Sequence, residues 1–196
     1  ERYVPVMEFL CDNGYACIIH DHRGHGKSVK APEDLGYFYS SGWEGIVADI
    51  FVVNGMAKGM FPEKPVFLFG HSMGSLAVRC FAKRFDDLID GLVVCGSPSK
   101  NPATGAGLML TRVIGSIKGD RHRPGLIHKM AFEGFNKKFA SEGPNAWLST
   151  DKTVVDMYNA DPLCGYMFTA NGFIGLFNLM KDCYSLSNWK ISDPQM

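Results

Sequence analysis

The chain has 196 residues, of which 46% are hydrophobic, so it is long enough to bury a substantial core. Its 20 basic and 20 acidic residues cancel to a formal net charge of zero, which does not favour nucleic-acid binding or a polybasic membrane contact. No apolar run reaches the length of a membrane-spanning helix, which leaves at most a peripheral membrane contact.

The first half of the chain alternates helical and strand-like patterns. Helices with one apolar face begin near Tyr3, Trp43 and Ser75. Short apolar runs predict strands over residues 15–20, 65–69 and 89–95. Strict alternation of helix and strand implies a parallel sheet with helices on its faces, so we expect an α/β fold.

The pattern changes near Lys100. No convincing strand follows over residues 101–187, where apolar residues, many of them Met and Phe, recur at helical spacing over 110–117, 154–158 and 173–180. These helices are interpreted either as plain core or as a lid whose apolar inner face holds an acyl chain. We therefore expect a core fragment over 1–99, a mostly helical cap (lid) over 100–187, and a segment over 188–196 that returns toward the core.

The most specific pattern is Gly70-His71-Ser72-Met73-Gly74, which stands between a predicted strand and a predicted helix. Strand, Gly-x-Ser-x-Gly and helix in this order are typical of the nucleophile elbow of serine hydrolases. The turn is so tight that the positions two before and two after the serine need small side chains. We expect Ser72 to be an exposed nucleophile and the Met73 backbone N–H to stabilise an oxyanion at the positive end of the helix.

Two other patterns suggest different chemistry and are rejected. Gly26-Lys27-Ser28 resembles the end of a P-loop, but Asp21 stands where that motif needs glycine. His20, His22 and His25 suggest a metal cluster, but the third histidine lies beyond a glycine, and we interpret all three as structural. We therefore expect no metal and no cofactor.

Two features of the composition bear on environment. The six cysteines are dispersed without a C-x-x-C pair, which favours buried, reduced thiols and a cytoplasmic location. The basic residues between Lys118 and Lys129 either form a solvated loop or meet an anionic head group.

The loop Asp21-His22-Arg23-Gly24-His25-Gly26-Lys27-Ser28, together with the Ser72 elbow, resembles the α/β-hydrolase superfamily. Within it, the sequence is most similar to the monoacylglycerol lipase and lysophospholipase branch, a serine-aminopeptidase-like (S33) group. Residues 147–151 and 161–165 resemble the cap of bacterial members. The resemblance implies cleavage of lipid-type carboxylic esters (monoacylglycerol or lysophospholipid) through an acyl-enzyme on Ser72. It also implies that the loop is structural, with Asp21 and Arg23 as an internal ion pair or backbone anchors.

The same resemblance shows what the sequence lacks. Such hydrolases carry a strand before the first helix, which supplies a second oxyanion donor and lies between the strands expected at 15–20 and 65–69. Their triad acid and histidine follow the cap. We therefore expect a chain truncated at both ends, with the triad Asp and His outside it and little activity alone. We expect His71 to point away from Ser72 into packing, and we assign no base among the six histidines.

Serine at position 72 argues against the branches of the superfamily that use aspartate or cysteine as nucleophile. Two alternatives to a lipid esterase stay open: a peptidase of the same fold, and a noncatalytic α/β-hydrolase-like module that binds a ligand. The sequence leaves the oligomeric state open.

Overall fold

The computed structural model describes residues 3–187 and 189–190. Its strands β1 (Phe67–His71) and β2 (Gly91–Cys95) pair in parallel, with Phe67 opposite Gly91 and His71 opposite Cys95. Helix α3 (Met73–Phe85) and a short 3-10 turn, η2 (Asp86–Leu88), connect them. This β–α–β unit confirms the parallel α/β arrangement predicted for the centre of the sequence.

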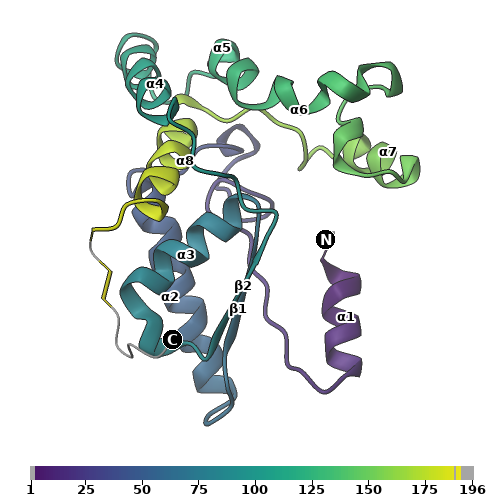
Figure 1. Cartoon of the computed structure of the whole chain (residues 1–196), viewed down its shortest axis with the longest axis vertical. Helices are drawn as coiled ribbons and strands as arrows, with labels where there is room; N and C mark the ends of the chain where they lie inside the picture. Colours follow the sequence, from purple (N-terminus) through teal and green to yellow (C-terminus); the bar gives the residue numbers. More distant parts are fainter. Residues whose placement is uncertain (1–2, 188, 191–196) are drawn as a thin grey trace.

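The helices cover the sheet unequally. Helices α2 (Gly42–Met60) and α3 lie on one side of it, whereas α1 (Val4–Asp12) lies apart on the other side (Figure 1). On that second face, Phe67 and Phe69 are 55% and 50% exposed. The main core therefore forms on the α2–α3 side, and its buried members are Phe38, Ile46, Val47, Ile50, Leu76, Ala77, Val78, Cys80, Phe81, Ile89, Ile127, Phe173, Leu176, Leu179 and Cys183.

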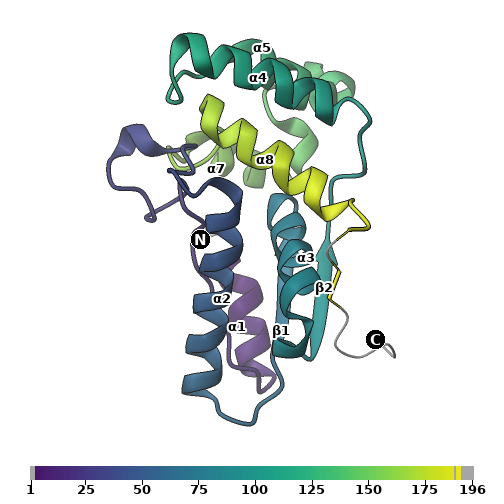
Figure 2. The same cartoon turned by 90° about the vertical axis from the view of Figure 1, so that its left-hand side faces the viewer.

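The second half of the chain is helical within the described residues 101–187, as predicted. Figure 2 shows α4 and α5 above the core, with α8 running beneath them toward α3. Besides η1 (Pro32–Asp34) in the first half, the remaining elements are α4 (Thr104–Lys118), α5 (Gly125–His128), η3 (Lys129–Glu133), α6 (Gly134–Asn136), η4 (Lys137–Glu142), η5 (Ala146–Leu148), α7 (Lys152–Ala160) and α8 (Ala170–Cys183). The predicted return segment falls mostly on positions 188 and 191–196, which lie outside the described residues.

Charged side chains fasten α8 to α3. Arg84 donates two hydrogen bonds of 2.8 Å to the two carboxylate oxygens of Asp182. Lys83 is fully buried, and its Nζ donates to the backbone carbonyls of Asp182 (2.6 Å) and Ser185 (3.1 Å). Because a buried ammonium is costly unless it is paired, these contacts fix where the end of α8 sits on α3.

The strand predicted over residues 15–20 is wrong: this segment is irregular and belongs to no sheet. A strand needs a neighbour that completes its ladder of hydrogen bonds. In the described part of the chain β1 pairs only with β2, so residues 15–20 have no strand beside them. Their apolar side chains are exposed as a result, among them Tyr15, Ile18 and Ile19.

Helix α4 divides its apolar side chains between the core and solvent. The helix buries small residues against α8: a Cβ on Gly107 would lie 3.2 Å from Phe177, and one on Gly115 would lie 3.4 Å from Ala170. Close approach of two helices needs small residues at the contact. Leu108 is buried and Ile114 packs against the core, whereas four other large apolar side chains are exposed, namely Met109, Leu110, Val113 and Ile117.

Candidate active site

Ser72 stands at the sharp turn between β1 and α3. Its φ of +53° and ψ of −121° are rare for a residue with a side chain, and such strain is concentrated at functional sites. The Ser72 N–H donates to the Cys95 carbonyl (3.0 Å), which ties the turn to the end of β2. Ser72 is exposed, and its hydroxyl caps no N–H of α3, although serine at this position commonly does.

The two glycines of the motif have different roles. A Cβ on Gly70 would lie 2.5 Å from both the Gly74 carbonyl oxygen and the Val78 side chain, so position 70 admits only glycine. A Cβ on Gly74 would meet only His22, at 3.7 Å, which is an ordinary contact. The expectation that both positions need small side chains is therefore correct for Gly70. Gly74 is not required by any contact among the described residues.

Met73 is the first residue of α3. N–H groups in the first turn of a helix have no intrahelical acceptor, and they lie at the positive end of the helix dipole. The backbone N–H of Met73 is thus at the helix position from which an oxyanion donor acts.

The loop over residues 21–28 is bound to α2 and closed on itself by charged side chains. Arg23 forms a bidentate ion pair with Asp49 of α2, with N–O distances of 2.8 and 2.7 Å. Asp21 accepts a hydrogen bond from the Lys27 N–H (2.9 Å) instead of pairing with Arg23. Sequence reasoning anticipated an ion pair and a backbone anchor here but missed Asp49, because its distance along the chain hides the pairing.

His22 brings the loop to the elbow, since its Nε2 faces the Cα of Gly74. Burial, reinforced by the neighbouring His25 and His20, lowers the pKa of His22 to about 3, so the ring is neutral at physiological pH. The His22 ring lies 5.1 Å from that of His20 and 6.3 Å from that of His25. Sequence reasoning classed the three histidines as structural but gave no sign of this contact with the elbow.

No histidine in the described part of the chain hydrogen-bonds to the Ser72 hydroxyl. His71 lies against Gly96, where a Cβ would be 2.9 Å from its Nε2, and against the ring of Tyr3. It remains exposed, which differs from the packed position expected for it. The described residues therefore supply a nucleophile position without a base.

The basic residues after α4 are mostly engaged. Arg121 pairs with the buried Asp34 and lies over the ring of Tyr37. Arg123 donates to backbone carbonyls, including that of Leu35 (2.8 Å). These contacts tie residues 121–123 to residues 33–37 and leave neither arginine as a free site for an anion.

The cysteines differ from the expectation of burial. Cys80 and Cys183 are buried, whereas Cys11 and Cys95 are exposed and Cys17 and Cys164 are half-buried. All six are free thiols. Dispersal along the chain did not reveal this difference.

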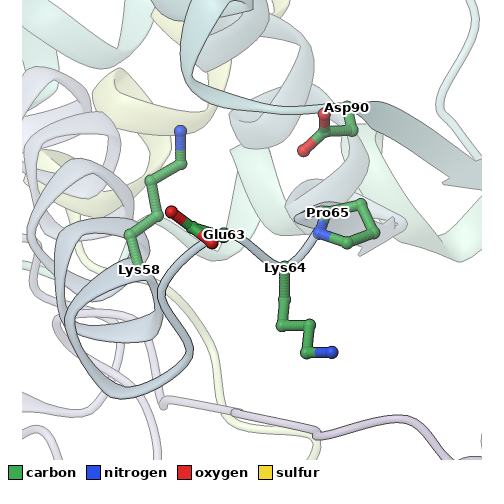
Figure 3. Close-up of a pocket in the computed structure, with 5 residues that line it drawn as sticks. All are labelled: Lys58, Glu63, Lys64, Pro65 and Asp90. Atoms are coloured by element: carbon green, nitrogen blue, oxygen red, sulfur yellow. The ribbon is translucent and has the colours of Figure 1, made fainter.

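A cavity far from Ser72 is lined by Lys58, Glu63, Lys64, Pro65 and Asp90 (Figure 3). It lies at the amino ends of β1 and β2, opposite the elbow, and ligand sites of parallel sheets form at the carboxyl ends. One of its two carboxylates has a structural role, since Asp90 accepts from the Val66 N–H (2.7 Å). Over residues 3–187 and 189–190, no three His, Cys, Asp or Glu side chains are arranged to hold a metal, and no helix is long and apolar enough to cross a bilayer.

Known proteins with similar sequences are hydrolases by name. The chain is 30% identical over 168 residues to monoglyceride lipase of Homo sapiens, and 25% identical over 163 residues to that of Rattus norvegicus. Each match covers 83% of this chain and 47% of the relative. The chain thus spans about half the length of the curated relatives it matches.

Solved structures agree on the fold. A thermostable carboxyl esterase from Bacillus coagulans, in complex with glycerol, aligns with a TM-score of 0.83 at 21% identity, covering 92% of this chain and 59% of the esterase. A lipase described as an open form aligns with a TM-score of 0.84 at 24% identity, covering 95% of this chain and 62% of the lipase. The fold class predicted from the sequence, an α/β-hydrolase core with helical additions, is confirmed.

The family model for serine aminopeptidase, S33, matches residues 1–191. This match covers the Ser72 elbow, the 21–28 loop and the helices above the core. The chain belongs to the serine aminopeptidase S33 family of α/β-hydrolases.

Proposed function

We propose that the protein is a serine hydrolase that cleaves carboxylic esters of lipid type, a monoacylglycerol or a lysophospholipid. The observation that carries the proposal is the conformation of Ser72, an exposed serine held at positive φ between a parallel strand and a helix. Such a backbone conformation costs about 1–3 kcal/mol of strain, and strain of this size is concentrated at functional sites.

In the proposed reaction the Ser72 hydroxyl attacks the ester carbonyl carbon, and a histidine takes its proton. The Met73 N–H stabilises the negative charge on the carbonyl oxygen. The alcohol then leaves with that proton, and water releases the acid from the acyl-enzyme. Because no described histidine bonds to Ser72, we propose that the triad His and Asp come from outside these 196 residues.

The substrate class rests on the helices after Lys100. We propose that residues 1–99 form the catalytic core and residues 100–187 a lid over it. The outward side chains of α4 support an apolar substrate over a peptide, since Met109 and Ile117 are 71% and 76% exposed. No acidic residue occurs over 104–119, whereas Arg112 and Lys118 do, which suits a peripheral contact with a lipid surface.

The similarity to monoglyceride lipases supports the same substrate class. The family description, serine aminopeptidase, keeps a peptidase as the second candidate. Free thiols throughout the chain support a cytoplasmic location.

The test measures hydrolysis of p-nitrophenyl esters of short, medium and long acyl chains by the protein expressed from its complete reading frame. We expect preference for the longer esters, and Ser72→Ala is expected to lower kcat by about 10⁶-fold. Ser97→Ala is the matched control, because Ser97 follows β2 much as Ser72 follows β1, and it should retain activity. Cleavage of aminoacyl anilides but not of esters would favour the peptidase. Absence of any hydrolysis would favour a binding module.

A further inference from the structure

Three asparagines in the chain directly precede a glycine, namely Asn13, Asn54 and Asn171. In such a pair the side-chain amide carbon lies close in the chain to a backbone nitrogen that no side chain shields, since glycine has no Cβ. That nitrogen can attack the amide carbon and expel ammonia when the backbone is free to bring the two atoms together. Because the three pairs share this chemistry, their surroundings decide which of them reacts.

Asn13 lies at an exposed helix end. It directly follows the last residue of α1, a helix with no buried residue, and the chain reverses after it (Figure 1). Its Nδ2 donates to the Phe9 carbonyl (2.8 Å), and the Gly14 N–H donates to the Cys11 carbonyl (3.0 Å). Gly14 has a φ of +87°, and a Cβ placed on it would have no neighbour within 4 Å. A helix end without buried side chains therefore holds this pair, and such ends open at little cost in free energy.

The other two pairs are held inside helices that pack on the core. Asn54 is 4% exposed within α2, and its Nδ2 donates to the Leu88 carbonyl (3.2 Å). Asn171 lies in the first turn of α8, where its Oδ1 accepts from the Phe38 N–H (2.8 Å) and its Nδ2 donates to the Tyr39 carbonyl (3.1 Å). Reaction at either pair requires a core helix to open, which costs more free energy than opening the end of α1.

We propose that Asn13 is a deamidation site, at which the folded protein converts asparagine to aspartate and isoaspartate with water as the co-reactant. The Gly14 nitrogen attacks the side-chain carbon of Asn13 and forms a succinimide ring. The amide nitrogen takes up the proton of the Gly14 N–H and leaves as ammonia. Water then opens the ring at one of its two carbonyls. Opening at the side-chain carbonyl gives aspartate, and opening at the backbone carbonyl gives isoaspartate.

Either product changes the end of α1. The new carboxylate cannot donate to the Phe9 carbonyl, so the hydrogen bond that Asn13 makes there is lost. It also adds a negative charge beside Asp12, at the end of the helix where the dipole is already negative. We therefore expect the last turn of α1 to open more readily after the conversion. The site does not depend on hydrolase activity, since it rests on α1 and the chain reversal alone.

The experiment incubates the folded protein, expressed from its complete reading frame, in heavy-oxygen water at neutral pH and physiological temperature. The ring-opening water marks the products formed during this incubation, which separates them from deamidation during digestion in ordinary water. Trypsin places the three pairs in separate peptides, because Arg23, Lys58 and Lys152 lie between them. Mass spectrometry then gives the rate at each pair. We expect Asn13 to react at least about 10-fold faster than the other two asparagines, since only its pair lies outside a core helix.

The same protein in urea is the matched control, because unfolding frees all three pairs and their rates should become similar. Protein isoaspartyl methyltransferase should methylate the Asn13 peptide of the aged protein. It should leave that peptide of Asn13→Gln unmethylated, because the longer glutamine side chain does not readily form the ring. Circular dichroism checks that Asn13→Gln is folded. Similar rates at the three pairs in the folded protein, or no conversion of Asn13 there while it reacts in urea, would overturn the proposal.

Discussion

Helices α3 and α4 have similar apolar spacing in the sequence, yet they differ in which of their large apolar side chains are buried. Helix α3 buries its large side chains, including Leu76 and Phe81, in the core. Helix α4 buries Leu108 and Thr111 and packs small residues against α8, but it turns Val113 and Ile117 to solvent. The spacing of apolar residues therefore identifies a helix, whereas the element that packs against the helix decides which face is buried. Helix α3 holds the elbow in place, whereas the exposed apolar face of α4 is the part that we propose for contact with lipid.

The largest expected effect concerns the attachment of α3 to α8. Asp182→Ala removes the carboxylate that pairs with Arg84 at 2.8 Å and lies 3.6 Å from the fully buried Lys83. Breaking a buried ion pair leaves an uncompensated charge, so the free energy of unfolding should fall by about 3–5 kcal/mol in urea denaturation. Asp156→Ala, which removes an exposed pair with Lys152, is the control and should cost about 0–1 kcal/mol. Equal losses in the two variants would mean that α8 is not held on α3 in this way.

The next prediction compares the two glycines that flank Ser72, Gly70 in β1 and Gly74 in α3. Gly70→Ala places a Cβ 2.5 Å from a backbone carbonyl and from Val78, and should cost about 1–3 kcal/mol of stability. Gly74→Ala meets only His22, at 3.7 Å, and should change the free energy of unfolding by less than about 1 kcal/mol. Urea denaturation of both variants measures the difference. A larger loss for Gly74→Ala would show that the elbow is closed by a contact absent from the described residues.

The third prediction uses pH to test how the 21–28 loop supports α3. The pKa of His22 is lowered to about 3 in the folded chain, and the ordinary value of about 6.5 applies when it is unfolded. Between these values the unfolded chain binds more protons, so stability is complete above about pH 6.5 and falls as the pH decreases toward 3. From pH 7 to pH 5 we expect a loss of about 1–2 kcal/mol.

His22→Gln is the control for that titration and should reduce the dependence on pH without abolishing it, because burial also lowers the pKa of His20 and the pKa of His25. Asp182, whose pKa is lowered despite its burial because Arg84 bonds to it, loses its contribution only below the ordinary range of a carboxyl group. It therefore does not contribute between pH 5 and 7. A slope unchanged in His22→Gln would contradict the buried, neutral state of His22.

The smallest expected effect on stability concerns the outward face of α4. Ile117→Asp should change the free energy of unfolding by less than about 0.5 kcal/mol, because the side chain is 76% exposed. The same variant should lower cosedimentation with vesicles that contain anionic lipid. Leu108→Ala, on the buried face of the same helix, should cost about 2–5 kcal/mol. Retained vesicle binding by Ile117→Asp would remove α4 from the proposed lipid contact.

The sequence predicts well where a local pattern decides the structure. Strands β1 and β2, helices α2 and α3, and the turn at Ser72 follow from apolar spacing and from glycine at position 70. The strand predicted over residues 15–20 does not form, because a strand needs a neighbouring strand and the local sequence pattern carries no information about one. The pair of Arg23 with Asp49 could not be assigned, because charges 26 positions apart carry no signal of contact. The orientation of α4 could not be predicted, because its contact with α8 is made at Gly107 and Gly115 and its apolar residues are divided between the core and solvent.

Labelling with a fluorophosphonate probe tests whether Ser72 is the nucleophile of the proposed hydrolase. The probe reacts covalently with an activated serine, and peptide mapping then identifies the labelled residue. In the protein expressed from its complete reading frame, we expect label on Ser72. The label should be lost in Ser72→Ala and retained in Ser97→Ala. Label that persists in Ser72→Ala, or that maps to another serine, would contradict it.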